Sequence, residues 1–284
     1  MARLNCGRAE CGLGDGDNME LSKRLNAVAS LVTDGYRLAD IGTDHAYIPI
    51  FLVSTGKIPA AVAMDVNRGP LLRAEENIRA HGLQDKITTR ISDGFAALEE
   101  NEADAAVIAG MGGPLTIRIL KEGKDIVRSL KECILQPQSE IEKVRAFLLE
   151  EGFFFLREDM VEEDGKYYPM MKVLPPGDGR GAGCERTGKE PDRKEPDRKE
   201  PDGRGNGAQG SGVQGWNDTE LRYGKILLEE KNPVLREYLQ REIRIRAQIL
   251  DRLKGRDSAD VQRRKTELEK ELKIAEKGMD HYAV

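Results

Sequence analysis

Long apolar runs are missing from this sequence. No stretch of about 18 apolar residues occurs, so the sequence predicts no membrane span and no membrane partner. The opening residues, MARLNCGRAECGLGDGDNME, also lack the apolar core of a secretory signal peptide. We therefore expect a cytoplasmic protein.

Cysteine is scarce, with four residues in a chain of 284. The spacing of Cys6 and Cys11 matches no standard zinc arrangement. We interpret these two, together with Cys133 and Cys184, as incidental thiols in a reducing compartment, and we expect no metal site.

An excess of positive charge is also absent. The 45 Lys and Arg residues stand against 50 Asp and Glu residues, which gives a net charge of -5 and excludes a uniformly basic coat for nucleic acid. A local basic patch stays compatible with this composition, because nucleic-acid binding depends on where the charges cluster. The length suits one ordinary α/β domain and a smaller appendage.

Two segments predict disorder. Residues 1–18 are rich in glycine and polar residues and form an expected leader, so that Met19 is an alternative start to Met1. Residues 175–217 contain KEPDR, KEPDR and KEPDG in succession. Proline at every fifth position prevents helix and sheet, and little apolar surface is present to bury. We expect a solvated linker or insertion without chemistry.

Residues 19–174 alternate between apolar, strand-like runs and helical runs. The expected strands cover 37–41, 60–66, 86–91, 103–109 and 131–136, and the helices between them include 69–82 and 139–152. The last part, FFFLREDMVEEDGKYYPMMKVL, predicts two more strands around the Asp164–Gly165 turn. The order predicts an α/β fold, with a doubly wound, mainly parallel sheet that closes on an antiparallel hairpin.

Residues 218–284 return to a helical pattern. Two apolar stripes lie on either side of an interruption at 255–258; they consist of Leu235, Leu239, Ile243, Leu250 and Leu253, and of Val261, Leu268, Leu272, Ala275 and Met279. Two helices with a short connection predict an antiparallel hairpin, and the narrow stripes are typical of a coiled coil.

Acids and glycines follow the ends of four consecutive expected strands. They are Asp40, Gly42, Asp44 and His45 after the first, Asp65 after the second, Asp93 and Gly94 after the third, and Gly110 and Met111 after the fourth. Each residue alone is common in a turn or a helix cap. Because open α/β sheets bind ligands at the carboxyl ends of their strands, the recurrence favours one shared binding site.

The loop at 42–47 decides which cofactor the site suits. A dinucleotide needs Gly-x-Gly-x-x-Gly so that backbone amides approach the pyrophosphate, whereas Asp44 and Tyr47 stand at the later glycine positions here. S-adenosylmethionine has no phosphate and carries a sulfonium cation, which an acid-rich loop attracts. We expect this cofactor, with Asp65 on its ribose and Asp93 on its adenine amine, and we disfavour a dehydrogenase.

Residues 20–174 resemble class I S-adenosylmethionine-dependent methyltransferases and, more narrowly, the bacterial tRNA (adenine-22-N1)-methyltransferase family. The resemblance rests on LSKRL (21–25), ADIGTDHAYIP (39–49), Asp65, SDGF (92–95), IAGMGG (108–113), LQPQ (135–138), EEDGKYY (162–168) and, in the helical hairpin, EEKNPVL (229–235). It implies a Rossmann-like methyltransferase fold with a C-terminal coiled-coil domain, and methylation of N1 of an adenine in the D-arm region of tRNA.

The resemblance also implies roles for residues. The cofactor pocket is expected to contain Asp40, Gly42, His45, Asp65, Asp93, Gly94, Gly110 and Met111. Asp44 is the expected catalytic residue, facing the target base; its alternative role is a contact to the sulfonium or amino group of the cofactor. Asp65 stands where some relatives have Glu, which should serve the same ribose contact.

The expected substrate contacts come from both parts of the chain. AGMGG (109–113) lacks the polar-Pro-Pro-aromatic stretch used for exocyclic N6 methylation, which favours N1 of adenine. The base is expected between Tyr47, Met111, Tyr167 and the pair Gln136–Pro137, although for both tyrosines a place in the protein wall is an equal alternative. RNA contacts are expected from Lys23, Arg24, Arg241 and Arg244, with a merely solvated helix face as the alternative for the last two.

Two other functions stay open at this point. One is a methyltransferase acting on another RNA or on a small molecule. The other is a non-catalytic RNA- or protein-binding module that keeps the fold. We expect a monomer, with an oligomer as the alternative.

Overall fold

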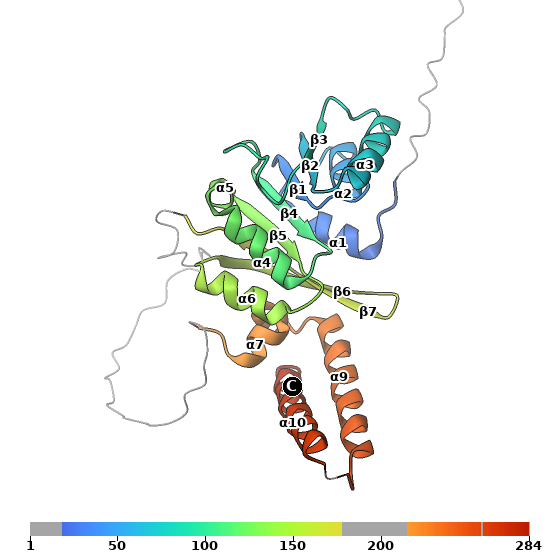
Figure 1. Cartoon of the computed structure of the whole chain (residues 1–284), viewed down its shortest axis with the longest axis vertical. Helices are drawn as coiled ribbons and strands as arrows, with labels where there is room; N and C mark the ends of the chain where they lie inside the picture. The colour runs from blue at the N-terminus through green and yellow to red at the C-terminus, as the bar shows by residue number, and fades with distance from the viewer. Residues whose placement is uncertain (1–18, 178–214, 257, 284) are drawn as a thin grey trace, which may run out of the picture.

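The computed structural model of the chain describes residues 19–177, 215–256 and 258–283. Helices and strands alternate over most of residues 23–174, and the elements after residue 217 are helices (Figure 1). The expected leader at 1–18, most of the expected linker at 175–217, and Cys6, Cys11 and Cys184 lie outside the described residues. Among the helices in the described ranges, none is long and apolar enough to cross a membrane.

The first ten elements alternate almost regularly. They are α1 (Lys23–Leu31), β1 (Leu38–Ile41), α2 (Tyr47–Ser54), β2 (Ala61–Asp65), α3 (Arg68–Ala80), β3 (Ile87–Ile91), β4 (Ala105–Ala109), α4 (Gly113–Glu122), α5 (Lys124–Ser129) and β5 (Glu132–Gln136). The remaining elements are α6 (Ile141–Glu150), β6 (Phe154–Glu163), β7 (Lys166–Leu174), α7 (Asp218–Tyr223), α8 (Lys225–Glu229), α9 (Pro233–Arg252) and α10 (Ala259–Asp280). The five strands expected before residue 140 agree with these bounds within two residues.

The seven strands form a sheet in the order β3-β2-β1-β4-β5-β7-β6. The strands β1 to β5 run parallel, and β7 pairs antiparallel with both β5 and β6. This confirms the expected mainly parallel sheet with a terminal antiparallel hairpin. The strand order reverses between β1 and β4, which is the place where open α/β sheets bind ligands.

Two hydrophobic cores cover the two faces of the sheet. Successive residues of β1 point to opposite faces, so Leu38 packs with α1, α2 and α3, whereas Ala39 packs with α4, α5 and α6. Both faces of the central strands are therefore buried, which explains why their sequences are almost continuously apolar.

The C-terminal helices α9 and α10 lie side by side as an antiparallel pair (Figure 1). Two contacts define the pairing: the Tyr282 hydroxyl donates to the Asn232 carbonyl at 2.8 Å, and Arg246 Nε donates to Glu271 Oε2 at 2.9 Å. From the expected apolar stripes, Leu235, Leu239, Leu268 and Ala275 are buried. The expected helices are thus present, and the coiled-coil packing stays a prediction.

A buried ion pair within the sheet domain also binds the backbone of the helical part. Arg145 on α6 donates through Nε to Glu158 Oε1 on β6 at 2.8 Å, with both side chains almost fully buried. Arg145 Nη1 also donates to the carbonyls of residues 221 and 222, and Glu158 accepts from the amide of residue 226. Gly224 is required here, because a Cβ would lie 2.6 Å from Glu158 Oε1. These bonds fix α7 and α8 against β6.

Candidate functional site

The parallel strands bring the predicted residues to one edge of the sheet. The loops after β1, β2, β4 and β5 leave this edge together, because the four strands are parallel neighbours. The backbone amides of Gly42 and Thr43 both donate to the Met64 carbonyl at the end of β2, at 2.7 and 2.8 Å. The first loop is therefore held against the second strand.

A cavity of about 200 Å³, here called the strand-end cavity, opens at this edge. It is lined by Arg24, Leu25, Asp40, Gly42, Thr43, Asp44, His45, Tyr47, Ile48 and Ala109. Six of these lining residues were expected from the sequence to contact the cofactor, the base or the RNA. Arg24 comes from α1, and the other five, which follow one another from β1 to the start of α2, are Asp40, Gly42, Asp44, His45 and Tyr47.

The loop after β1 needs an unusual backbone path. Gly42 has a φ of +75°, and a Cβ at this position would lie 2.0 Å from Met111 Cε. His45 and Ala46 also have positive φ values, of 63° and 56°, immediately before α2 begins. Glycine adopts this conformation without strain, whereas other residues do so rarely. The expected pocket residues Gly42 and Met111 are therefore in direct contact.

Asp40 is a carboxylate buried inside the central strand, with only 7% of its surface exposed. Burial raises its pKa to about 6, and the nearby charge of Asp65 acts in the same direction. An ionised carboxylate in this position gains more from a cationic ligand than an exposed one, because water does not screen the interaction.

Asp44 lies at the exposed rim of the strand-end cavity. Its Oδ1 accepts a hydrogen bond of 2.9 Å from Arg73 Nη2 on α3 and lies 3.4 Å from His45 Nε2. The His45 ring stacks on Tyr47, with 5.0 Å between the ring centroids. Sequence reasoning missed Arg73, because this partner lies 29 positions away along the chain and depends on how α3 packs.

The acids after β2 and β3 have protein partners as well. Asp65 Oδ1 accepts from the backbone amide of Asn67 at 2.6 Å, an arrangement that holds the turn into α3. Asp93 is bound by both terminal nitrogens of Arg118 on α4, at 3.0 and 3.2 Å. Neither acid lines the strand-end cavity. An adenine amine at Asp93 would have to share this carboxylate with Arg118, which the sequence did not indicate.

Backbone hydrogen bonds connect the loops after β4 and β5. Gly110 donates to the Gln136 carbonyl at 3.0 Å, and the Gln138 amide donates to the Met111 carbonyl at 2.8 Å. Gly113 begins α4 so close to the second loop that a Cβ there would lie 2.5 Å from the Ser139 carbonyl oxygen. Small residues in AGMGG therefore permit close backbone packing.

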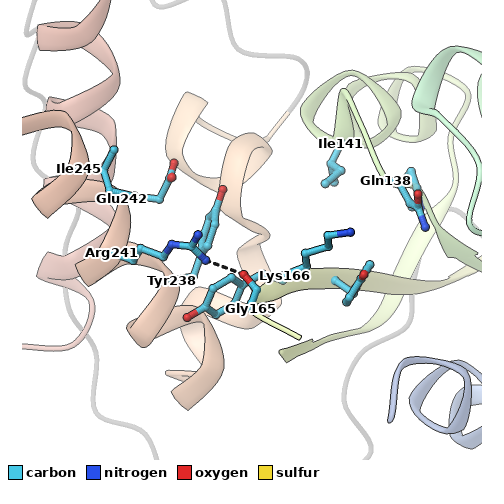
Figure 2. A pocket seen from close by; sticks show the side chains of 11 residues that line it. Gln138, Ile141, Gly165, Lys166, Tyr238, Arg241, Glu242 and Ile245 are labelled. Carbon is cyan, nitrogen blue, oxygen red and sulfur yellow. Dashed lines mark hydrogen bonds between the residues drawn. The ribbon is translucent and has the colours of Figure 1, made fainter. Parts of the chain in front are cut away.

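A second cavity, of about 470 Å³, lies between the β6–β7 turn and α9, and is here called the interdomain cavity (Figure 2). Its lining residues are Pro137, Gln138, Ile141, Gly165, Lys166, Tyr167, Tyr168, Tyr238, Arg241, Glu242 and Ile245. Figure 2 shows Arg241 and Glu242 on one side, Gln138 and Ile141 across from them, and the hydrogen bond of 2.7 Å from Arg241 Nη1 to the Gly165 carbonyl.

Arg24 stands between the two cavities. It lines the strand-end cavity, its Nη1 donates to the buried Gln136 side chain at 3.0 Å, and its guanidinium lies 5.6 Å from the centre of the Tyr168 ring. Tyr168 in turn lines the interdomain cavity. The wall between the two cavities therefore contains one cation, Arg24, one amide side chain, Gln136, and one aromatic ring, Tyr168.

A family model described as "Methyltransferase domain" matches residues 21–171, which is more than half of the chain. A Streptococcus pneumoniae structure described as "a putative tRNA (m1A22) methyltransferase" is 31% identical, with a TM-score of 0.72, over 92% of this chain and 100% of that chain. This chain belongs to the tRNA (adenine-22-N1)-methyltransferase family.

One further relative of this chain, and a second structure of the same S. pneumoniae protein, carry related descriptions. The Bacillus subtilis tRNA (adenine(22)-N(1))-methyltransferase is 39% identical over 155 residues, which are 55% of this chain and 65% of that relative, so the match spans slightly less than two thirds of its length. The S. pneumoniae protein in complex with S-adenosyl-L-methionine is 30% identical, with a TM-score of 0.70, over 92% of this chain and 100% of that one.

The residues expected to contact the substrate lie in different parts of the structure. Tyr47 lines the strand-end cavity, whereas Pro137, Tyr167 and Arg241 line the interdomain cavity. Gln136 is fully buried below Arg24. Two expected RNA contacts, Lys23 and Arg244, are exposed on α1 and α9 and line neither cavity.

Proposed function

We propose that this methyltransferase transfers a methyl group from S-adenosylmethionine to N1 of adenine 22 in tRNA. The reaction is the one named for the B. subtilis relative. The structural observation that carries the proposal is the acid-lined loop of the strand-end cavity. Asp40 and Asp44 lie there, where a phosphate-binding loop would instead present free backbone amides.

The residues around β1 fit a cationic methyl donor. When bound, S-adenosylmethionine supplies an electrophilic methyl group on a positively charged sulfur. The buried Asp40 carboxylate attracts this charge. Gly42 has no side chain and adopts a positive φ, so a ligand can approach the backbone of the loop closely. We assign Asp65 to the ribose hydroxyls, and Asp93 with Gly94 to the adenine of the cofactor. Asp93 then has to share its carboxylate with Arg118 or give up that hydrogen bond.

Asp44 supports the attack of adenine N1. The N1 lone pair lies in the plane of the base, so no proton has to leave before the attack. Positive charge develops on the adenine ring as the methyl group arrives, and a carboxylate that accepts a hydrogen bond from the exocyclic amine stabilises this charge. His45 and Arg73 hold the Asp44 carboxylate at the rim of the strand-end cavity.

Alignment supplies much of the remaining rate enhancement. Well-oriented reactants recover roughly 7–11 kcal/mol of an activation barrier. Because N1 lies on the Watson–Crick edge, a paired adenine has to leave the base stack before it enters the cavity. Tyr47, which is 38% exposed at the rim, and Met111 are the side chains that we assign to the flipped base.

The RNA is proposed to cross both parts of the chain. Lys23 and Arg24 lie on α1, and Arg241 and Arg244 on α9. Arg24 lies over the Tyr168 ring and Arg241 over the Tyr167 ring, so cations from both helices contact the β6–β7 hairpin. We propose that the reaction takes place in the cytoplasm and that the protein acts there as a monomer. Light scattering of the purified chain tests the oligomeric state.

A methylation assay tests the proposed function. The purified protein is incubated with methyl-labelled S-adenosylmethionine and, in parallel reactions, with unmodified tRNAs or unmodified ribosomal RNA, and the digested RNA is searched for N1-methyladenosine. Label in N1-methyladenosine of tRNA is expected. Label in ribosomal RNA alone, or in N6-methyladenosine, would point to a different methyltransferase activity. Binding of the cofactor without any transfer would support a non-catalytic module.

A further inference from the structure

The interdomain cavity combines aromatic rings with free positive charge. Tyr167, Tyr168 and Tyr238 line it, and the Tyr167 and Tyr238 rings lie 5.0 Å apart between their centroids. The Tyr238 phenol is neutral at physiological pH and repels no anion, and burial raises its pKa further, to about 12. The volume of about 470 Å³ is within the range of about 300–1,000 Å³ typical of small-ligand sites.

The charges of the cavity favour an anion. Lys166 is exposed at its edge and, within the described residues, its side chain forms no ion pair or hydrogen bond. Arg241 donates to the Gly165 carbonyl and lies 5.6 Å from the Tyr167 ring centre, but no carboxylate of the described chain pairs with it. The one acid in the lining, Glu242, is engaged by Arg246 Nη1.

Neutral aromatic faces next to unpaired cations are typical of sites for single-stranded nucleic acid. Bases stack on aromatic rings with little dependence on sequence, and the phosphate backbone follows the positive groups. Arg24 of the strand-end cavity lies 5.6 Å from the Tyr168 ring of the interdomain cavity. Arg24 Nη1 and Gln138 Nε2 also both lie 3.8 Å from the position that a Cβ would take at Gly110. A nucleotide in the interdomain cavity would therefore lie next to the adenine that is methylated.

We propose that the interdomain cavity binds a nucleotide adjacent to the methylated adenine, with its base against the tyrosines and its phosphate on Lys166. This proposal rests on the proposed function. It gives the helical hairpin a specific role, because α9 closes a nucleotide pocket in addition to offering charge along its surface. It also assigns Tyr167 to the neighbouring nucleotide instead of the flipped adenine.

Lys166 offers a clean test, because its side chain forms no hydrogen bond or ion pair with any described group. Lys166→Ala is expected to weaken tRNA binding about fivefold, as for one phosphate contact of moderate strength, and to reduce the slope of log affinity against log salt by about 0.7–0.9. Lys166→Arg keeps the charge and should retain most of the affinity. Lys86→Ala is the matched control, since Lys86 is also exposed but precedes β3, the edge strand on the side of the sheet away from β6 and β7.

Cross-linking locates the nucleotide. Transcripts of tRNA carrying 4-thiouridine immediately before or after the target adenine are irradiated with the full chain, and cross-linked peptides are mapped. Cross-links in 165–168 or 238–245 support the proposal. Cross-links elsewhere, or equal tRNA affinity of the Lys166→Ala and Lys86→Ala variants, would overturn it.

Two further measurements separate this proposal from others. If adenosine monophosphate binds in a Lys166-dependent manner while tRNA binding ignores the substitution, the cavity serves a free nucleotide and the proposal is wrong. If the wild-type chain methylates tRNA but the Lys166 and cross-linking results are negative, only the nucleotide pocket fails. If the wild-type chain transfers no methyl group to tRNA, the proposed function fails first.

Discussion

Arg73 on α3 donates a hydrogen bond of 2.9 Å to the Asp44 carboxylate, which belongs to the loop after β1. The pair joins the proposed catalytic acid to the helix that follows β2. Both side chains remain about half exposed, with 64% for Asp44 and 47% for Arg73. Only Oδ1 of Asp44 is used in the ion contacts to Arg73 and His45, so Oδ2 is the oxygen that we assign to the target base.

Asp44→Asn tests the proposed catalytic role. The substitution keeps the shape of the side chain and removes the negative charge that stabilises a cationic adenine. We expect turnover to fall by about 100-fold or more, by analogy with the loss of one group that stabilises transition-state charge. Calorimetry should show nearly unchanged affinity for S-adenosylmethionine. Near-normal turnover, or loss of cofactor binding as the main effect, would contradict the assignment.

Arg73→Gln is the matched control for Asp44→Asn. It leaves the carboxylate in place and removes its partner, so it should reduce turnover much less. Because the pair is exposed, the free energy of unfolding should change by less than about 1 kcal/mol. Equal losses of turnover in the two variants would show that the pair, and not the Asp44 charge itself, is what the reaction requires.

Gly42→Ala tests the close contact with Met111. The added Cβ would lie 2.0 Å from Met111 Cε, and a φ of +75° costs a non-glycine residue about 1–2 kcal/mol. We expect a lower free energy of unfolding and weaker binding of S-adenosylmethionine. Met111→Ala in the same chain should relieve the collision but not the backbone strain, so denaturant titration should show partial recovery. Full recovery would mean that the backbone conformation has no importance.

The buried carboxyl of Asp40 predicts a pH dependence of stability. Its pKa rises from 3.8 in the unfolded chain to about 6 in the folded protein, so the folded state holds a proton that the unfolded chain has lost. The free energy of unfolding is therefore highest, as far as Asp40 is concerned, below about pH 4. It falls by about 3 kcal/mol in total as the pH rises through about 6.

Asp40→Asn removes this pH dependence. Relative to the wild type, the variant should gain unfolding free energy between about pH 4.5 and about pH 7.5, as measured by denaturant titration without cofactor. At the upper end of this range it should also bind S-adenosylmethionine more weakly, because the attraction for the cation is lost. A difference between variant and wild type that is constant over this pH range would contradict the assigned cause.

The buried ion pair between Arg145 and Glu158 predicts a large loss of stability when one partner is removed. Arg145→Met leaves a buried, unpaired carboxylate and should cost about 3–5 kcal/mol of unfolding free energy. Adding Glu158→Leu removes that charge and should recover a substantial part. Denaturant titration gives both values; a double variant that is no better than Arg145→Met would show that the bonds to α7 and α8 dominate.

The sheet could be predicted because buried parallel strands require almost continuously apolar runs, such as AAVIA and, apart from Asp40, LADI. The turn at Asp164–Gly165 also separates two strands. The residues at the strand ends could also be predicted, since topology alone gathers them at one edge. The partners of Asp44 and Asp93 could not be. Arg73 and Arg118 lie 29 and 25 positions away, on helices whose rotation depends on core packing.

The separation of the two cavities was equally hidden from the sequence. Tyr47 and Tyr167 both suited a base-holding role, but the wall around Arg24 places them in different cavities. That wall arises from contacts between α1, β5 and β7, which lie far apart in the chain. No pattern within a short stretch of sequence predicts where these three elements meet.

The most direct test of the proposed reaction compares two tRNA transcripts that differ only at nucleotide 22, which is adenine in one and guanine in the other. Each is incubated with the full chain and labelled S-adenosylmethionine, and incorporated methyl groups are counted and mapped. We predict N1-methyladenosine at position 22 of the first transcript and almost no label in the second. Equal labelling of both transcripts would contradict methylation at this adenine.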